Sequence, residues 1–200
     1  MSVSSQAKTN KRKLWLLLAV FALPIILSIV FYQFAELRPS GIVSHGQLIR
    51  PAQPLNWVPM QDIKQKKHDE KLINEYWTLL TITSSQCDQV CQNNLYVMRQ
   101  VHLAQGDQLH RARRLWLVTD SLNPKKLPAE ITEDLGLVVI PNLPQSILQQ
   151  FALPADKKVV ENRMYLIDPN GNLMMYYEAD AQPSGIMKDL RKLLKVSQIG

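Results

Sequence analysis

The first strong pattern along the chain is an uncharged apolar run from Leu14 to Tyr32. At about 1.5 Å per helical residue, its nineteen residues would extend roughly 28 Å, close to the thickness of the hydrocarbon core of a bilayer. Pro24 lies inside the run, but a single proline is tolerated in a membrane helix. The pattern therefore predicts one transmembrane helix at residues 14–32.

From Lys71 onward, short runs rich in β-formers alternate with helical periodicity, which is typical of an α/β domain. Glu75–Ile82 and Leu115–Thr119 have the composition of buried strands. Between them, Gln89–Gln105 has the apolar spacing of a helix that ends at Gly106. A strand, a helix and a strand in this order indicate a right-handed crossover between parallel strands.

The second half of this domain continues the alternation. Gly136–Ile140 is a short apolar run that could add a strand, and Pro144–Phe151 fits a helix that begins with proline. Arg163–Ile167 and Leu173–Tyr177 flank an Asp-Pro-Asn-Gly turn and predict a β-hairpin, which a helix at about Ser184–Val196 follows. The sequence thus predicts an α/β, thioredoxin-like domain of order β-α-β-α-β-β-α behind one N-terminal transmembrane helix.

These patterns divide the chain into four segments. We expect a basic tail at 1–13, a membrane anchor at 14–32, a proline-containing tether at 33–70 and the thioredoxin-like domain at 71–200. Prolines and small residues between 36 and 59 favour an extended tether. Part of the tether can pack on the domain through four apolar residues: Leu48, Ile49, Leu55 and Trp57.

The positive charge is concentrated ahead of the apolar run. The formal net charge is +6, and Lys8, Lys11, Arg12 and Lys13 supply four of these charges, which leaves +2 for the rest of the chain. So small a remainder argues against a nucleic-acid partner. Because basic residues beside a membrane span stay in the cytoplasm, we expect a single-pass protein of the inner membrane with a periplasmic C-terminal domain. The run is longer than that of a cleaved signal peptide, so the anchor is expected to be retained.

Both cysteines, Cys87 and Cys91, lie where the first predicted strand leads into the first predicted helix. If the residues between them are helical, the two side chains share one face, with Cα atoms roughly 6 Å apart, and can form a disulfide. The amino terminus of a helix stabilises a thiolate, which predicts Cys87 as the nucleophile. Asp88 disfavours a second negative charge beside it and predicts a less acidic, more reducing thiol.

Other interpretations of the cysteine pair stay open. The pair could be a structural disulfide, although a bond that closes so short a loop removes little entropy from the unfolded chain. It could also stay reduced and inert. Two thiolates form a soft site that suits Cu(I), with Cys87 and Cys91 as metal ligands. Along a helix, Met98 and His102 would stand roughly 10 and 16 Å beyond Cys91, too far to join them.

The remaining histidines, His45, His68 and His110, offer no obvious further ligand. We expect each histidine to be exposed and to bind no metal. No cofactor is therefore certain from the sequence, and Cu(I) is the candidate.

Several of these motifs together resemble the Sco/SenC family of cytochrome c oxidase assembly factors. The resemblance runs from about Tyr76 to Leu194 and rests on the anchor and three motifs: Thr83-Ser-Ser-Gln-Cys87-x-x-x-Cys91, LWLVTD ending at Asp120, and Tyr165-Leu-Ile-Asp-Pro-Asn-Gly171. It implies a thioredoxin-like fold and copper-binding thiols that serve the dinuclear copper site of the oxidase. In that family a proline usually follows each cysteine, where this chain has Asp88 and Gln92. The family's histidine has no counterpart in 157–163.

The thiol pair and the resemblance predict a membrane-anchored thiol-disulfide protein that assists assembly of the oxidase copper site. It would reduce partner cysteines or handle Cu(I) transiently, with Cys87 attacking and Cys91 resolving the mixed disulfide. Expected partners are the membrane and an oxidase subunit or another assembly factor. The alternative is a non-catalytic membrane scaffold with the same fold, which would not need the cysteines.

Overall fold

The computed structural model describes residues 3–33, 44–153, 156 and 161–197. The chain separates into two compact units, one within 1–42 and the other within 43–200. The first contains helix α1 (Val3–Gln33), on which the large apolar side chains between Trp15 and Val30 are exposed. Among the described residues, no helix combines the length and the apolar character that crossing a membrane requires. The span at 14–32 stays a prediction.

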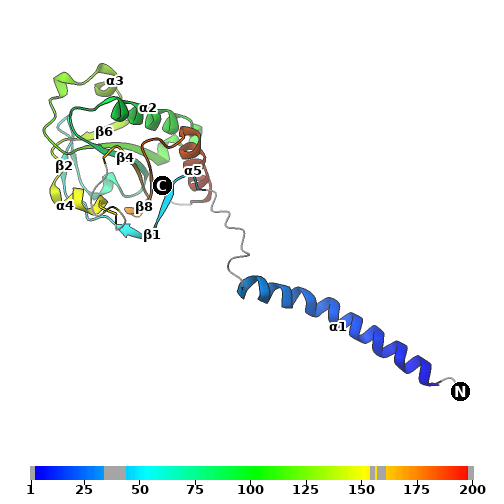
Figure 1. Cartoon of the computed structure of the whole chain (residues 1–200). Coiled ribbons are helices and arrows are strands. Elements are labelled where there is room, and N and C mark those ends of the chain that lie inside the picture. Colours follow the sequence, from blue (N-terminus) through cyan, green and yellow to red (C-terminus); the bar gives the residue numbers. More distant parts are fainter. Residues whose placement is uncertain (1–2, 34–43, 154–155, 157–160, 198–200) are drawn as a thin grey trace. The chain divides into compact units, whose positions relative to one another are not determined.

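The second unit, in which Figure 1 labels β1, β4, β6 and β8, is built on a six-stranded sheet. The strand order is β1-β8-β7-β4-β5-β6. The three parallel strands are β4 (Trp77–Thr83), β5 (Ala112–Val118) and β6 (Leu137–Ile140). The hairpin strands β7 (Met164–Ile167) and β8 (Asn172–Tyr177) are antiparallel to each other, and β7 is antiparallel to β4. All seven residues of β4 are buried, as expected of a strand covered on both faces.

Helices cover both faces of this sheet. One face packs against α2 (Gln89–Leu103) and α5 (Pro183–Val196), the other against α4 (Gln145–Leu148) and η5 (Gln149–Phe151). Alternate residues of each strand enter opposite cores, since Leu79 packs toward α2 whereas Leu80 packs toward η5. The shorter elements are η2 (Glu70–Leu72), η3 (Gly106–Arg111), η4 (Pro124–Lys126) and α3 (Ala129–Thr132).

The predicted α/β thioredoxin-like fold is confirmed, with β6 as the additional strand. The predicted hairpin forms because Asp168 Oδ1 accepts hydrogen bonds from the backbone N–H groups of Asn170 and Asn172, at 3.0 and 2.9 Å. Gly171 completes this turn with a φ of +78°, a conformation that glycine adopts without steric cost.

The segment predicted as a tether contributes to the domain. β1 (Gln47–Pro54) pairs antiparallel with β8 and forms one edge of the sheet. β2 (Met60–Gln61) and β3 (Lys67–His68) form a small separate hairpin. The sheet therefore includes residues well before 71, where the domain was expected to begin. Prolines are compatible with an edge strand, which is why the proline content of this segment was a poor guide.

A buried carboxylate fastens the start of β1 to α5. Asp189 is only 4% exposed, and its Oδ2 accepts hydrogen bonds from the backbone N–H groups of His45 and Gly46, at 2.7 and 3.0 Å. The His45 Nδ1 lies 3.1 Å from Asp189 Oδ1, and the Tyr177 hydroxyl donates to Oδ2 at 3.3 Å. Burial, together with this carboxylate, raises the pKa of Tyr177, so the phenol stays protonated.

His102 links α2 to β5 through a second buried network. Arg114 Nε donates to His102 Nδ1 at 3.1 Å, and His102 Nε2 lies 3.0 Å from the carbonyl oxygens of both Leu109 and Ala112. Because a guanidinium only donates and a carbonyl only accepts, the ring must be neutral with its proton on Nε2. Arg114 also forms a bidentate ion pair with Asp134, at 2.7 and 2.8 Å.

This network predicts loss of stability in acid. Burial, and then the nearby positive charge of Arg114, lower the pKa of His102 below its ordinary 6.5. The unfolded chain therefore takes up a proton near pH 6.5 that the folded chain does not, and the free energy of unfolding should decrease as the pH falls below that value. The decrease should approach at most about 1.4 kcal/mol per pH unit for one proton.

Urea unfolding between pH 7.5 and 5 measures this dependence. His102→Gln should flatten it, whereas His110→Gln, at an exposed histidine, should leave it as in the wild type. Equal slopes for the two variants would contradict the role given to His102.

Candidate functional site

The two cysteines lie on a loop that leaves the carboxyl end of β4. The loop is tied to the neighbouring strand at two points. Thr119 N–H donates to the Thr83 carbonyl at 3.0 Å, and the Asp120 carboxylate accepts from the Ser85 N–H and hydroxyl at 2.6 and 2.7 Å. The ends of β4 and β5 thus fix the path of the chain into α2.

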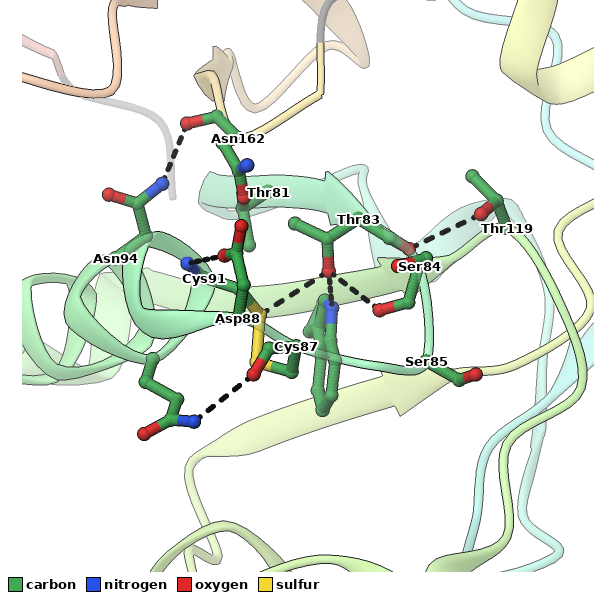
Figure 2. Close-up of a disulfide and its surroundings, with 12 residues drawn as sticks. Thr81, Thr83, Ser84, Ser85, Cys87, Asp88, Cys91, Asn94, Thr119 and Asn162 are labelled. Atoms are coloured by element: carbon green, nitrogen blue, oxygen red, sulfur yellow. Dashed lines mark hydrogen bonds between the residues drawn. A yellow bond between two sulfur atoms is a disulfide. The ribbon is translucent and has the colours of Figure 1, made fainter.

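Cys87 and Cys91 are joined as a disulfide, with Cα atoms 5.0 Å apart (Figure 2). The residues between them are helical only from Gln89, where α2 begins, so the condition for a shared helical face is not met. Cys87 precedes the helix with a φ of +33°, in the left-handed region that non-glycine residues seldom occupy. The two side chains also differ in access, since Cys87 is 9% exposed and Cys91 only 1%.

Asp88 is the N-cap of α2. Its Oδ1 accepts from Cys91 N–H at 2.9 Å and its carbonyl accepts from Gln92 N–H at 2.9 Å. The Gln92 side chain in turn donates to the Cys87 carbonyl at 3.1 Å. Aspartate before a helical pattern is a recognised start signal. Our sequence interpretation treated Asp88 only as an opposing charge and missed this structural role.

The inner side of the disulfide faces β4 and β5. The Thr83 hydroxyl lies 3.4 Å from Cys91 Sγ, and Trp116 Nε1 donates to the same hydroxyl at 2.7 Å. Figure 2 shows Thr83 beside the Cys87–Cys91 bond. Neither contact was predicted from the sequence.

The segment before β7 also approaches α2. Asn94 Nδ2 donates to the Asn162 carbonyl at 2.6 Å, and Asn162 N–H donates to the Ile82 carbonyl at 3.2 Å. Arg163, the next residue, forms ion pairs with Asp156 and Glu178. This is the segment in which the resembled family carries its histidine; residues 157–160 lie outside the described part of the chain.

The described residues bring no third metal-binding side chain to the thiols. Within that part of the chain, no group of three or more His, Cys, Asp or Glu residues is placed to hold a metal ion. The expectation that every histidine is exposed was wrong for His102, which is buried, and for His68, which pairs with Asp62 at 2.9 Å. In the oxidised state shown here, the sulfurs are not thiolates and do not form a metal site.

A groove of about 380 Å³ begins beside the first turn of α2. Its lining includes Gln92, whose side chain contacts the Cys87 backbone, and two residues one turn further on, Leu95 and Tyr96. Ile131 and Asp134 form part of the opposite wall. Gln92 thus connects this groove to the Cys87 backbone, while neither cysteine is among the residues that line it.

Comparison with known proteins supports this description of the domain. Residues 77–197 match a protein-family model described as "Transmembrane-like, thioredoxin-like, C-terminal domain". No curated protein matches the chain.

Several solved structures share the fold at low sequence identity. Copper-bound ScoI of Bradyrhizobium japonicum is 18% identical, with a TM-score of 0.52, over 70% of this chain and 98% of that chain. Apo Sco1 of Thermus thermophilus is 13% identical, with a TM-score of 0.56, over 75% and 96%. A candidate protein disulfide isomerase from Bacteroides thetaiotaomicron is 18% identical, with a TM-score of 0.55, over 76% and 94%. The resemblance to Sco proteins is thus confirmed at the level of the fold.

Asp88 has two effects, as the N-cap of α2 and as a negative charge beside Cys87, and two substitutions should separate them. Asp88→Ala removes the cap and should lower the free energy of unfolding by about 1 kcal/mol. Asp88→Asn keeps an oxygen acceptor but removes the charge, so it should retain most of the stability while the reduced chain is alkylated faster at Cys87. Urea unfolding and mass spectrometry after brief alkylation measure the two effects.

Asp180→Asn, at an exposed aspartate, serves as the control for the loss of one negative charge. If Asp88→Asn were as unstable as Asp88→Ala, or were alkylated at the wild-type rate, the corresponding role would be ruled out.

Proposed function

Because the chain belongs to the transmembrane-like, thioredoxin-like C-terminal domain family, we propose that it is a thiol-disulfide protein whose Cys87 and Cys91 reduce a disulfide in a partner. The observation that carries this proposal is the Cys87–Cys91 bond at the start of α2, in which Cys87 is the more exposed of two largely buried cysteines.

The difference in exposure between Cys87 and Cys91 supports an order of attack for the two thiols. The Cys87 thiolate attacks one sulfur of the partner's disulfide, and the other partner sulfur leaves as a thiolate. Cys91 then attacks Cys87 Sγ, which releases the second partner thiolate and forms the disulfide seen here. The two electrons that reduce the partner come from the Cys87–Cys91 pair, so one turnover leaves the chain oxidised.

We further propose that the partner belongs to the assembly of the cytochrome c oxidase copper site. The fold shared with copper-bound ScoI and with Sco1 supports this choice of partner, as does the resemblance of Cys87-x-x-x-Cys91 to the thiol motif of the Sco/SenC family. Copper-ligating cysteines must be reduced before they bind metal, and a dithiol protein can provide that step. In the reduced state, Cys87 and Cys91 offer two thiolates, a donor set that suits transient binding of Cu(I).

Cysteine variants of the full-length chain test the thiol chemistry. Cys87→Ser should abolish reduction of a peptide disulfide, because it removes the attacking sulfur. Cys91→Ser should accumulate a mixed disulfide between Cys87 and the peptide, visible by mass spectrometry. Ser146→Ala, at an exposed residue of α4, should behave as the wild type.

The same variants, reduced and exposed to Cu(I), test the metal proposal. The wild type should retain at most one equivalent, and either cysteine variant should lose it. Full support of oxidase assembly in cells by both cysteine variants would refute the thiol mechanism and favour a scaffold.

We also propose that residues 14–32 anchor the chain in the inner membrane with the thioredoxin-like domain in the periplasm. The basic residues before an uncharged run support this orientation. A reporter that is active only after export, fused behind Gly200, should therefore be active, and an inverse cytoplasmic reporter inactive. Replacing Lys8, Lys11, Arg12 and Lys13 by glutamine should reduce export; a cytoplasmic signal from the unaltered chain would overturn this topology.

A further inference from the structure

The hydroxyl of Thr83 lies between an indole and the enclosed sulfur of the disulfide. Its Oγ1 is 2.7 Å from Trp116 Nε1 and 3.4 Å from Cys91 Sγ. All three residues are buried: Thr83 is 3% exposed, Cys91 1% and Trp116 0%. Water is therefore a poor competitor for these contacts.

The donors and acceptors around this hydroxyl limit what it can do. Trp116 N–H can only donate, so it occupies one lone pair of the hydroxyl oxygen. The single hydroxyl proton then has two acceptors, the Ser84 carbonyl at 3.3 Å and Cys91 Sγ at 3.4 Å. A disulfide sulfur is a weak acceptor, whereas a sulfur that carries negative charge is a strong one. Reduction of the disulfide should draw the proton toward Cys91.

Cys91 lacks the donor that its position would otherwise supply. Residues in the first turn of a helix have free N–H groups that can face a thiolate. Here the Cys91 N–H donates to Asp88 Oδ1 at 2.9 Å and is already used. Among the described residues, the group that forms a hydrogen bond with Cys91 Sγ is the Thr83 hydroxyl.

We propose that the Thr83 hydroxyl stabilises the negative charge on Cys91 Sγ during thiol-disulfide exchange, and that Trp116 is the positioning residue that holds this hydroxyl in place. The inference rests on the proposed function. It adds the hydroxyl that lets the buried Cys91 sulfur carry negative charge during exchange. A charged group without a hydrogen bond is costly to bury, and a hydroxyl donor removes part of that cost.

The chemical step needs no further reagent. In the mixed disulfide, Cys91 Sγ carries the electron pair that forms the new bond to Cys87 Sγ, while the bond from Cys87 to the partner breaks and the partner sulfur leaves with its electron pair. Thr83 keeps its proton throughout and only redirects it, toward Cys91 while that sulfur is charged and toward the Ser84 carbonyl once the disulfide has formed. In the reverse direction, Cys91 is the leaving group and receives the same stabilisation.

The hydroxyl therefore favours the reduced pair over the disulfide. Because a hydrogen bond to a charged group is worth more than one to a neutral group, Thr83→Val should shift the exchange equilibrium toward the disulfide by about tenfold. That change corresponds to a reduction potential about 30 mV more negative. The resolving step should slow as well, so the mixed disulfide through Cys87 should persist longer.

The experiment measures the reduction potential of the purified full-length chain against a glutathione or dithiothreitol series, together with the decay of a mixed disulfide with a model peptide. Thr83→Ser keeps the hydroxyl and should restore both values to near those of the wild type. Thr81→Val is the matched control, since Thr81 lies on the same strand, is fully buried, and donates to the Arg163 carbonyl at 3.0 Å instead of to sulfur. The Thr81→Val variant should lose about as much stability as Thr83→Val, but its reduction potential should stay at the wild-type value.

Two further variants keep the test decisive if Thr83→Val folds poorly. Thr83→Ala should shift the potential in the same direction, and Trp116→Phe should shift it by a smaller factor, about two- to threefold, because the hydroxyl remains but is held less firmly. Unchanged potentials in the folded Thr83 variants, or failure of Thr83→Ser to restore the wild-type value, would overturn the inference. If the wild-type chain showed no thiol-disulfide exchange at all, the proposed function itself would be refuted.

Discussion

The parallel pairing of β4 with β5 is the constraint on which the site depends. Thr83 is the last residue of β4 and lies opposite Val118, the last residue of β5. The pairing continues past both strands, because the Thr83 carbonyl accepts from Thr119 N–H and the Asp120 carboxylate holds Ser85. The loop to the cysteines therefore starts from a fixed edge, and small movements of either strand would be transmitted directly to the disulfide.

Polar residues also lie on the sheet face that packs against α2. Thr81, Thr83 and Arg114 are all buried there, and each has a partner, respectively a carbonyl, an indole and a carboxylate. Satisfied polar groups specify one arrangement of neighbouring elements, since any other arrangement would leave a donor or acceptor unpaired. The α2 face of the sheet is thus held in register by hydrogen bonds as well as by packing.

Two different residues, Asp88 and Thr83, contact Cys91 at the start of α2. Asp88 caps α2 by binding the Cys91 N–H, which keeps the helix intact at the point where the disulfide joins it. That bond withdraws from the sulfur a donor that many reactive thiols use, and the strand side offers the Thr83 hydroxyl in exchange. Stability of the first helical turn and reactivity of the enclosed sulfur are therefore supplied by different residues.

Local chemistry allowed much of this fold to be predicted. The β7–β8 hairpin followed from Asp168 to Gly171, and α2 and α5 from apolar spacing, because these signals act between residues close in sequence. Of the candidate site, the cysteines could be predicted from the sequence and their surroundings could not. The thiols stand out in the sequence, but the bond between Thr83 and Trp116 joins residues thirty-three positions apart and depends on strand register. Sequence patterns do not encode that register directly.

Two further misses have the same physical origin. β1 contains Pro51 and Pro54, which argue against a strand unless it lies at an edge, and its position at the edge is decided by pairing with β8. His102 was expected to be exposed, and only the fold brings Arg114 and two carbonyl oxygens to its ring. In each case a distant partner made the arrangement favourable.

The attachment of His45 and Gly46 to Asp189 has a mechanical consequence. These two residues precede Gln47, the first residue of β1, so any tension that reaches the domain along the chain from its N-terminal side acts on the Asp189 carboxylate before it acts on β1. That carboxylate belongs to α5, which packs on the same core as α2. A pull on the chain would thus be shared across the helical layer, and the edge strand would be shielded from being peeled away residue by residue.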